Sequence, residues 1–183
     1  MESYLDSIIK QFEYYKSLGD KTFNQLSFEE LQWQSQEDSN SIAIITKHIA
    51  GNMLSRWTNF LTEDGEKEWR QRDLEFENTF DTIEDLIAYW ENGWSCMFTA
   101  LKALTNKDLE RIIYIRNEGH TVTEAINRQY AHYAYHIGQI VFLGKLLKGN
   151  EWQSLSIPKG NSSKYNSGKF SEEKSKRHFT DNL

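Results

Sequence analysis

Apolar positions along most of the chain recur every three to four residues, the spacing that places side chains on one face of a helix. Four stretches keep this pattern long enough to form long helices. Their predicted bounds are residues 3–18, 41–61, 83–101 and 122–147. At about 1.5 Å per residue the second would be roughly 31 Å long, which is enough for a full-length helix of a bundle. The pattern therefore predicts an all-α fold, an up-down four-helix bundle.

Short polar motifs mark the expected helix ends. Gly19 predicts the end of the first long helix. The segment Ser27–Glu30 has the form of a capping box and predicts a short connecting helix. Ser41 is a good N-cap for the second long helix, and Asp81 is the predicted cap of the third. A further capping box, Thr121–Glu124, predicts the start of the fourth.

Three segments depart from the helical pattern. Residues 111–116 are β-branched and aromatic and precede a turn sequence at 117–120, which predicts a short strand or hairpin before the last helix. The charged connection 62–76 is longer than a tight bundle turn needs. It is either a functional, lid-like loop or a solvated loop anchored by Trp69 and Phe76. Residues 159–183 are rich in Ser, Lys and Asn and are expected to be irregular.

The composition agrees with one globular domain. The chain has 183 residues, of which 38% are hydrophobic and 14% aromatic, so it can bury a sizeable core. It contains one proline and ten glycines, few interruptions for a helical protein. We expect residues 1–150 to form the bundle and residues 151–183 to form an extension that packs on the bundle or on a partner subunit.

Charge and cysteine use narrow the function classes. The net charge is −6 and no basic block occurs, which argues against a nucleic-acid partner. No apolar run approaches the roughly 20 residues that span a bilayer, and the N-terminus lacks the features of a signal peptide. A cytoplasmic protein with no membrane partner is expected. The single cysteine, Cys96, excludes an internal disulfide and is interpreted as a core residue.

Two histidines four residues apart are the main chemical signal. His132 and His136 lie on one face of the predicted last helix, so both imidazoles can reach the same point. His48, in the second long helix, is the third candidate ligand, because facing helices of a bundle bring inward side chains together. Three ligands leave a position open, as in catalytic zinc sites. The alternative is a buried histidine pair that is hydrogen-bonded to Tyr or Asn.

Four further residues are candidates for a role around these histidines. Asn52 lies one turn after His48. It is expected either to hydrogen-bond a water or an imidazole of the site, or only to make hydrogen bonds within the core. Arg56 and Arg128 are candidates to line the mouth of the site and bind a carboxylate, and their alternative is an ordinary salt bridge. Gln139 is a similar case.

The segment 48–52, followed far along the chain by 132–139, resembles the DinB-like superfamily of metal-binding four-helix bundles. The resemblance covers about residues 1–150, and two further segments, 56–66 and 155–160, look like one uncharacterised branch of it. It implies that the matching histidines, His48, His132 and His136, hold a divalent ion, usually zinc or nickel. It also implies a homodimer.

Several functions agree with this resemblance. Superfamily members with assigned activities include bacillithiol S-transferases and mycothiol-dependent isomerases. The first hypothesis is therefore an enzyme in which the ion activates a low-molecular-weight thiol as thiolate, and the bundle presents a small-molecule electrophile to it. The second is hydrolysis by a metal hydroxide. The third is a dimeric binding protein that senses a metal or small ligand without turnover. The sequence offers no unambiguous acid or base that would decide between them.

Overall fold

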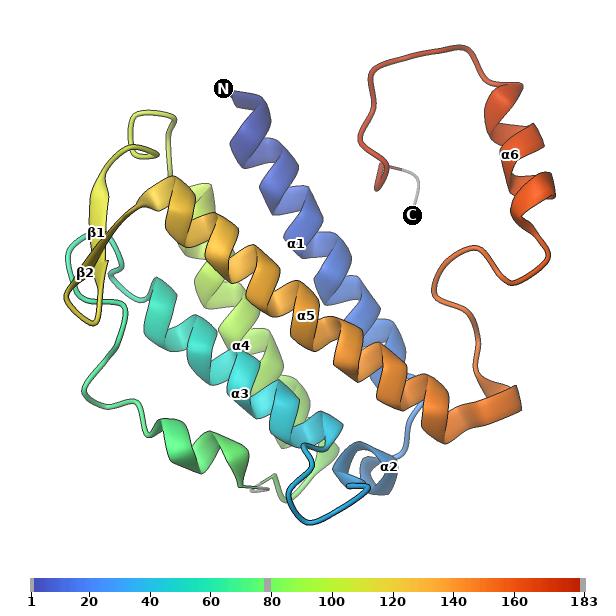
Figure 1. The fold of residues 1–183 in the computed structure, drawn as a ribbon, viewed down its shortest axis with the longest axis horizontal. Helices are drawn as coiled ribbons and strands as arrows, with labels where there is room; N and C mark the ends of the chain where they lie inside the picture. Colours follow the sequence, from blue (N-terminus) through green and yellow to red (C-terminus); the bar gives the residue numbers. More distant parts are fainter. Residues whose placement is uncertain (1, 78–79, 182–183) are drawn as a thin grey trace.

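The computed structural model describes residues 2–77 and 80–181, which form a mostly helical protein with a small two-stranded antiparallel sheet (Figure 1). The elements lie in the order α1 Glu2–Phe23, α2 Phe28–Gln32, α3 Ile42–Trp57, η1 Arg72–Phe76, α4 Ile83–Lys102, β1 Ile112–Ile115, β2 Glu118–Thr121, α5 Val122–Lys148, η2 Gly149–Glu151 and α6 Ser162–Phe170. No helix among the described residues is long and apolar enough to cross a membrane.

The four long helices pack against one another around an aromatic core. Helix α3 contacts α4 and α5, and α1 also contacts α4 and α5 (Figure 1). Trp90 and Trp94 of α4 are fully buried, and Trp94 meets Phe12 of α1 and Tyr133 of α5 edge-on. Burial of each such side chain stabilises the fold by about 1.5–3 kcal/mol or more. This core therefore holds α3 and α5, the helices that carry the histidines, next to each other.

The predicted long helices are present, with two corrections to their ends. Helix α1 does not stop at Gly19 but continues to Phe23. A Cβ at Gly19 would lie 2.6 Å from the ring of Trp90, so the glycine permits close helix packing. Helix α3 ends at Trp57, not at residue 61, because Asn59 adopts a left-handed conformation with φ 49°.

The caps of the helices follow the sequence prediction with one exception. The capping boxes of Ser27 with Glu30 and of Thr121 with Glu124 are both formed, and Ser41 caps α3. Helix α4, however, is capped by Thr82 and not by Asp81, since the Thr82 hydroxyl accepts the Asp85 backbone N–H. Either side chain is chemically suitable, and the chain geometry selects the one at the right position.

The predicted hairpin is present, but its turn lies earlier than expected. Strands β1 and β2 pair with Ile115 opposite Glu118, which leaves Arg116 and Asn117 as the turn. Both turn residues have positive φ, 57° and 62°, as two-residue hairpin turns require. Residues 118–120, predicted as turn, therefore belong to a strand. The hairpin leads directly into α5 and places Arg116 close to the loop that follows α3, because Gly65 donates its N–H to Tyr114.

The C-terminal segment is more regular than predicted. Helix α6 occupies Ser162–Phe170 in the stretch expected to be irregular. The extension contacts α1 and the turn after it at several described points, one of which is the ion pair of Lys10 with Asp181 at 2.5 Å. The side chain of Gln25 bonds the backbone of Gln153, and the ring of Phe179 packs edge-on against Tyr14. None of these contacts reaches the histidines.

Candidate metal centre

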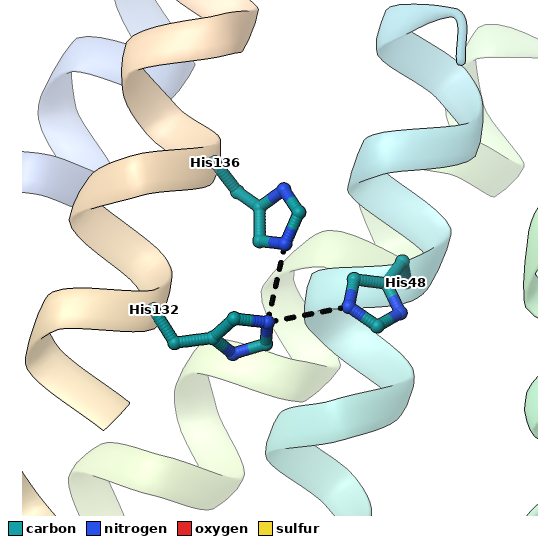
Figure 2. Close-up of side chains that lie close together, drawn as sticks. All are labelled: His48, His132 and His136. Atoms are coloured by element: carbon teal, nitrogen blue, oxygen red, sulfur yellow. Dashed lines mark hydrogen bonds between the residues drawn. The ribbon is translucent and has the colours of Figure 1, made fainter. Parts of the chain in front are cut away.

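Three imidazoles converge between α3 and α5 (Figure 2). The Nε2 atom of His132 lies 3.3 Å from Nε2 of His48 and 3.1 Å from Nε2 of His136. One ring nitrogen from each of the three residues lies within 4.8 Å of the others, so the cluster could hold a metal ion. His132 and His136 share a face of α5 because they are one helical turn apart.

The distances agree with ligands of one ion. Two imidazole nitrogens bound about 2.0–2.1 Å from a tetrahedral zinc ion lie roughly 3.3 Å apart. The two close nitrogen pairs, at 3.1 and 3.3 Å, are near this spacing. The donor set contains only imidazole nitrogens, which suits zinc and nickel better than magnesium or calcium.

The hydrogen bonds on the far sides of two rings fix which nitrogen faces the cluster. Nδ1 of His48 donates to Glu75 over 2.9 Å, and Nδ1 of His136 donates to the amide oxygen of Gln139 over 2.8 Å. Both rings therefore present an Nε2 lone pair to His132. A neutral His132 ring carries one hydrogen and can satisfy at most one of these two lone pairs. A cation between the three rings satisfies all of them, so the residues fit a metal ion.

Burial favours the neutral form of the two histidines of α5, His132 and His136. Burial lowers the pKa of His132 from its usual 6.5 to about 3, and the neighbouring His136, His48 and arginines act in the same direction. Burial also lowers the pKa of His136. Because a metal ion binds only the unprotonated nitrogen, neutral rings at pH 7 are ready to act as ligands.

A buried ion pair orients His48. Arg70 holds Glu75 in a bidentate contact, with Nε to Oε1 at 2.7 Å and Nη2 to Oε2 at 2.9 Å, and Glu75 in turn accepts from His48. Burial favours the neutral form of Glu75, but the hydrogen bonds from His48 and Arg70 outweigh it and lower the pKa of this carboxyl. Phe76 stacks on the His48 ring with a centroid distance of 5.0 Å. A carboxylate behind a ligand histidine fixes its tautomer and raises its basicity.

The connection after α3 thus supplies residues that the sequence interpretation did not select. Glu75, Arg70 and Phe76 all come from the charged segment 62–76. Of the two proposed anchors of this loop, Phe76 is partly buried, whereas Trp69 is 57% exposed. Gly51 in α3 leaves the space for the carboxylate, because a Cβ there would lie 2.5 Å from Oε1 of Glu75.

A pocket of about 220 Å³ opens beside the histidines. It is lined by nine residues, namely His48, Asn52, Arg56, Arg70, Arg72, Arg116, Arg128, Gln129 and His132. Both histidines of the pocket belong to the candidate metal centre, so a molecule in the pocket would lie next to a bound ion. Nε of Arg56 and Oε1 of Gln129 are buried without a hydrogen-bond partner among the described residues.

The chain matches one sequence family. The model of that family, described as a protein of unknown function (DUF1572), covers residues 1–161. The chain belongs to the DUF1572 family. No curated protein and no solved structure matches the chain. The DUF1572 match includes the three histidines, Glu75 and every arginine of the pocket, and it ends before α6 begins.

The other candidates from the sequence take different positions in this DUF1572 protein. Gln139 contacts the centre by accepting from His136. Asn52 lines the pocket, and its oxygen accepts from the hydroxyl of Tyr133 over 2.9 Å, whereas no hydrogen bond joins it to an imidazole among the described residues. Arg56 is 7% exposed, donates to the Gly65 carbonyl and pairs with Glu66 at 3.0 Å.

Arg128 is exposed and lines the pocket, and it has no ion pair within the described ranges. Of the two alternatives for this residue, an ordinary salt bridge is therefore not what the structure shows. Cys96 is partly buried, lies outside the histidine cluster and contacts Thr58 at 3.5 Å.

Proposed function

We propose that this DUF1572 protein is a metal-dependent enzyme with the DinB-like four-helix-bundle arrangement. It joins a low-molecular-weight thiol, of the bacillithiol type, through its sulfur to an electrophile. The observation that carries the proposal is the convergence of three imidazoles next to an open pocket. His48, His132 and His136 would hold the divalent ion, zinc or nickel. When bound, such an ion lowers the pKa of a coordinated thiol and so supplies a thiolate at neutral pH.

The chain's own residues contribute binding and orientation. Glu75 and Gln139 hold the His48 and His136 rings with Nε2 facing the centre. The pocket on the His48–His132 side receives the electrophile and places its reacting carbon near the sulfur. The thiol proton passes to solvent, the sulfur forms a bond to that carbon, and the leaving group departs with the electron pair of the broken bond.

A binding protein without turnover is the second candidate, and one observation favours it over hydrolysis. The carboxylates that contact the pocket arginines, Glu66 and Glu75, are both held in ion pairs. Within the described residues the pocket lining therefore contains no carboxylate free to act as a general base. Thiol transfer at a metal needs no such base, since the thiol is already ionised, whereas hydrolysis gains from one.

Cobalt-substituted protein tests the proposal. Addition of a small thiol such as cysteine should produce a new sulfur-to-metal charge-transfer band, in the wild type and in Cys96→Ser alike. The same protein should then consume thiol in the presence of an electrophile such as an alkyl halide, and His132→Ala should not. An unchanged spectrum at millimolar thiol with cobalt still bound would refute thiol activation. A band present before thiol addition and lost in Cys96→Ser would make Cys96 a fourth ligand and favour the binding protein.

The homodimer and the cytoplasmic location remain predictions. Tyr135, Phe142 and Leu146 of α5 are 63%, 65% and 57% exposed, and their spacing places them along one side of the helix. Sedimentation equilibrium of the full chain measures the oligomeric state directly.

A further inference from the structure

The pocket beside the histidines is lined by more arginines than the nearby carboxylates can neutralise. Five of the nine lining residues are arginines, in a chain whose net charge is −6. They come from four separate parts of the chain. Arg56 lies in α3, Arg70 and Arg72 in the connection after it, Arg116 in the hairpin turn and Arg128 in α5. The fold therefore assembles this positive charge from segments distant in sequence.

Few carboxylates balance these guanidinium groups. Glu66 alone contacts Arg56, Arg70 and Arg116, at 3.0, 3.5 and 3.1 Å. Glu75 contacts Arg70 and is shared with His48. Asp64 is also near, since Arg56 contributes to lowering its pKa, but burial and three backbone N–H groups act on it more strongly. Three carboxylates against five arginines leave an excess of two positive charges.

Two of the arginines are free to bind a ligand. Neither Arg72 nor Arg128 has a carboxylate partner within residues 2–77 and 80–181, and Arg72 only lies over the Phe76 ring, 5.3 Å from its centroid. Arg56 is more constrained, yet its Nε is a buried donor without an acceptor among the described residues. Asn52 adds an amide whose oxygen is occupied by Tyr133. The lining thus contains more hydrogen-bond donors than acceptors, and buried donors need partners.

We propose that this pocket binds a doubly charged oxyanion of the substrate, a phosphate group or a pair of carboxylates, held by Arg72 and Arg128. A planar guanidinium donates two parallel hydrogen bonds to such groups. Two excess positive charges match two negative ones. Because His48 and His132 line the same pocket, the anion would fix the rest of the molecule beside the metal centre. The anion site follows from the charges alone, whereas its role as a substrate site rests on the proposed thiol transfer.

Calorimetric titration of inorganic phosphate and of malonate into the metal-loaded full chain tests the inference. Both are oxyanions of the proposed kind. Comparison of their affinities distinguishes a site for phosphate from a site for two carboxylates. Arg72→Gln and Arg128→Gln should each weaken binding at least tenfold, because each removes charged hydrogen bonds. Arg111→Gln is the matched control, since Arg111 is half exposed, pairs with Asp108 and lies outside the pocket. It should bind like the wild type.

Three further measurements test whether the fold is intact, whether charge attraction holds the anion, and whether binding depends on the metal ion. Circular dichroism and metal content of the arginine variants should equal those of the wild type, which shows that the fold is intact. Binding should weaken as salt is raised, as expected for charge attraction. His136→Ala, which removes a metal ligand but no pocket residue, should still bind the anion.

The outcomes separate this inference from the proposed function. Absence of binding of both anions to the wild type would overturn the inference. So would binding that survives in both arginine variants and disappears in His136→Ala, because the ion alone would then hold the anion. Arginine-dependent binding in a protein without thiol-dependent activity would support the anion pocket and leave the proposed function refuted.

Discussion

Glu75 accepts a hydrogen bond from Nδ1 of His48 over 2.9 Å, although 27 positions separate the two residues in the chain. The contact links the connection after α3 to the metal centre. It fixes the His48 tautomer, and Arg70 keeps the carboxylate charged and in place. The loop is therefore part of the site and not only a connection between helices.

Glu75→Gln should weaken metal binding about 10–100-fold, because a neutral amide is a poorer acceptor and supports the His48 ring less well. The affinity is measured by competition with a chromophoric chelator at neutral pH. Gln preserves the size of the side chain, which limits the structural effect of leaving Arg70 with one carboxylate partner fewer. The exposed Glu68, changed to Gln, is the control and should leave the affinity unchanged. Equal affinity of Glu75→Gln and wild type would show that this hydrogen bond does not support the metal.

Gly51→Ala should also weaken metal binding, although this substitution replaces no charged residue. The new methyl would lie 2.5 Å from Oε1 of Glu75, and this carboxylate is held by two partners and cannot simply rotate away. Overpacking of this kind typically costs about 1–3 kcal/mol of unfolding free energy. Gly138→Ala on α5 is the control, because a methyl group there would meet no described atom within 4 Å and alanine favours a helix. If Gly51→Ala bound metal with the same affinity as Gly138→Ala, the metal affinity would not depend on the position of the Glu75 carboxylate.

The metal-free protein should lose stability as the pH falls from about 6.5 toward 3. The unfolded chain protonates His132 near its usual pKa of 6.5, whereas the folded chain, with a pKa of about 3, does not. The unfolded state thus binds more protons in this window, and the free energy of unfolding falls with pH. Glu75 acts with the same sign below its usual pKa of 4.5, because its pKa is lowered in the fold.

Urea denaturation at a series of pH values across this window measures the loss. His132→Gln should show a smaller decrease in the free energy of unfolding over the same range, since the titrating group is gone. Identical pH dependence of the variant and the wild type would contradict the assignment to His132.

Acid should release the metal before the helices unfold. Protons compete with the ion for the imidazole nitrogens, so the affinity should fall as the pH drops below about 6.5. The fully buried Trp90 and Trp94 and the core around them hold the long helices together without the ion. Metal release, followed with a chelating dye, and helicity, followed by circular dichroism, should change at different pH values in one titration. A single concerted loss would show that the ion is structural.

The sequence predicts the helices of this protein better than its site. Long amphipathic patterns with caps locate α1, α3, α4 and α5, because helix spacing is a local property of the sequence. The prediction of a stop at Gly19 is wrong, because the role of this glycine depends on Trp90, a residue far along the chain. The predicted hairpin turn lies one or two residues too late, because both 116–117 and 117–120 contain residues that suit turns.

Within the site, the sequence likewise predicts the three histidines better than the residues around them. The spacing of His132 and His136, with His48 on a facing helix, predicts that they meet, and the structure brings them together. That they bind a metal remains a prediction. Glu75 and Arg70 could not be placed from the sequence, because the path of an irregular connection depends on tertiary contacts. Glu75 is one of six acidic residues in the connection 62–76, and Arg70 is one of its three basic residues, so charge and loop length alone do not single them out.

The central claim is that His48, His132 and His136 bind one divalent ion, and elemental analysis of the purified full chain tests it most directly. After loading with zinc or nickel and removal of excess metal, the wild type should contain about one ion per chain. His132→Ala and His136→Ala should each lose most of it. His120→Ala, a histidine outside the cluster, should keep it. A wild type without bound metal after loading, or full metal content in both ligand variants, would contradict the claim.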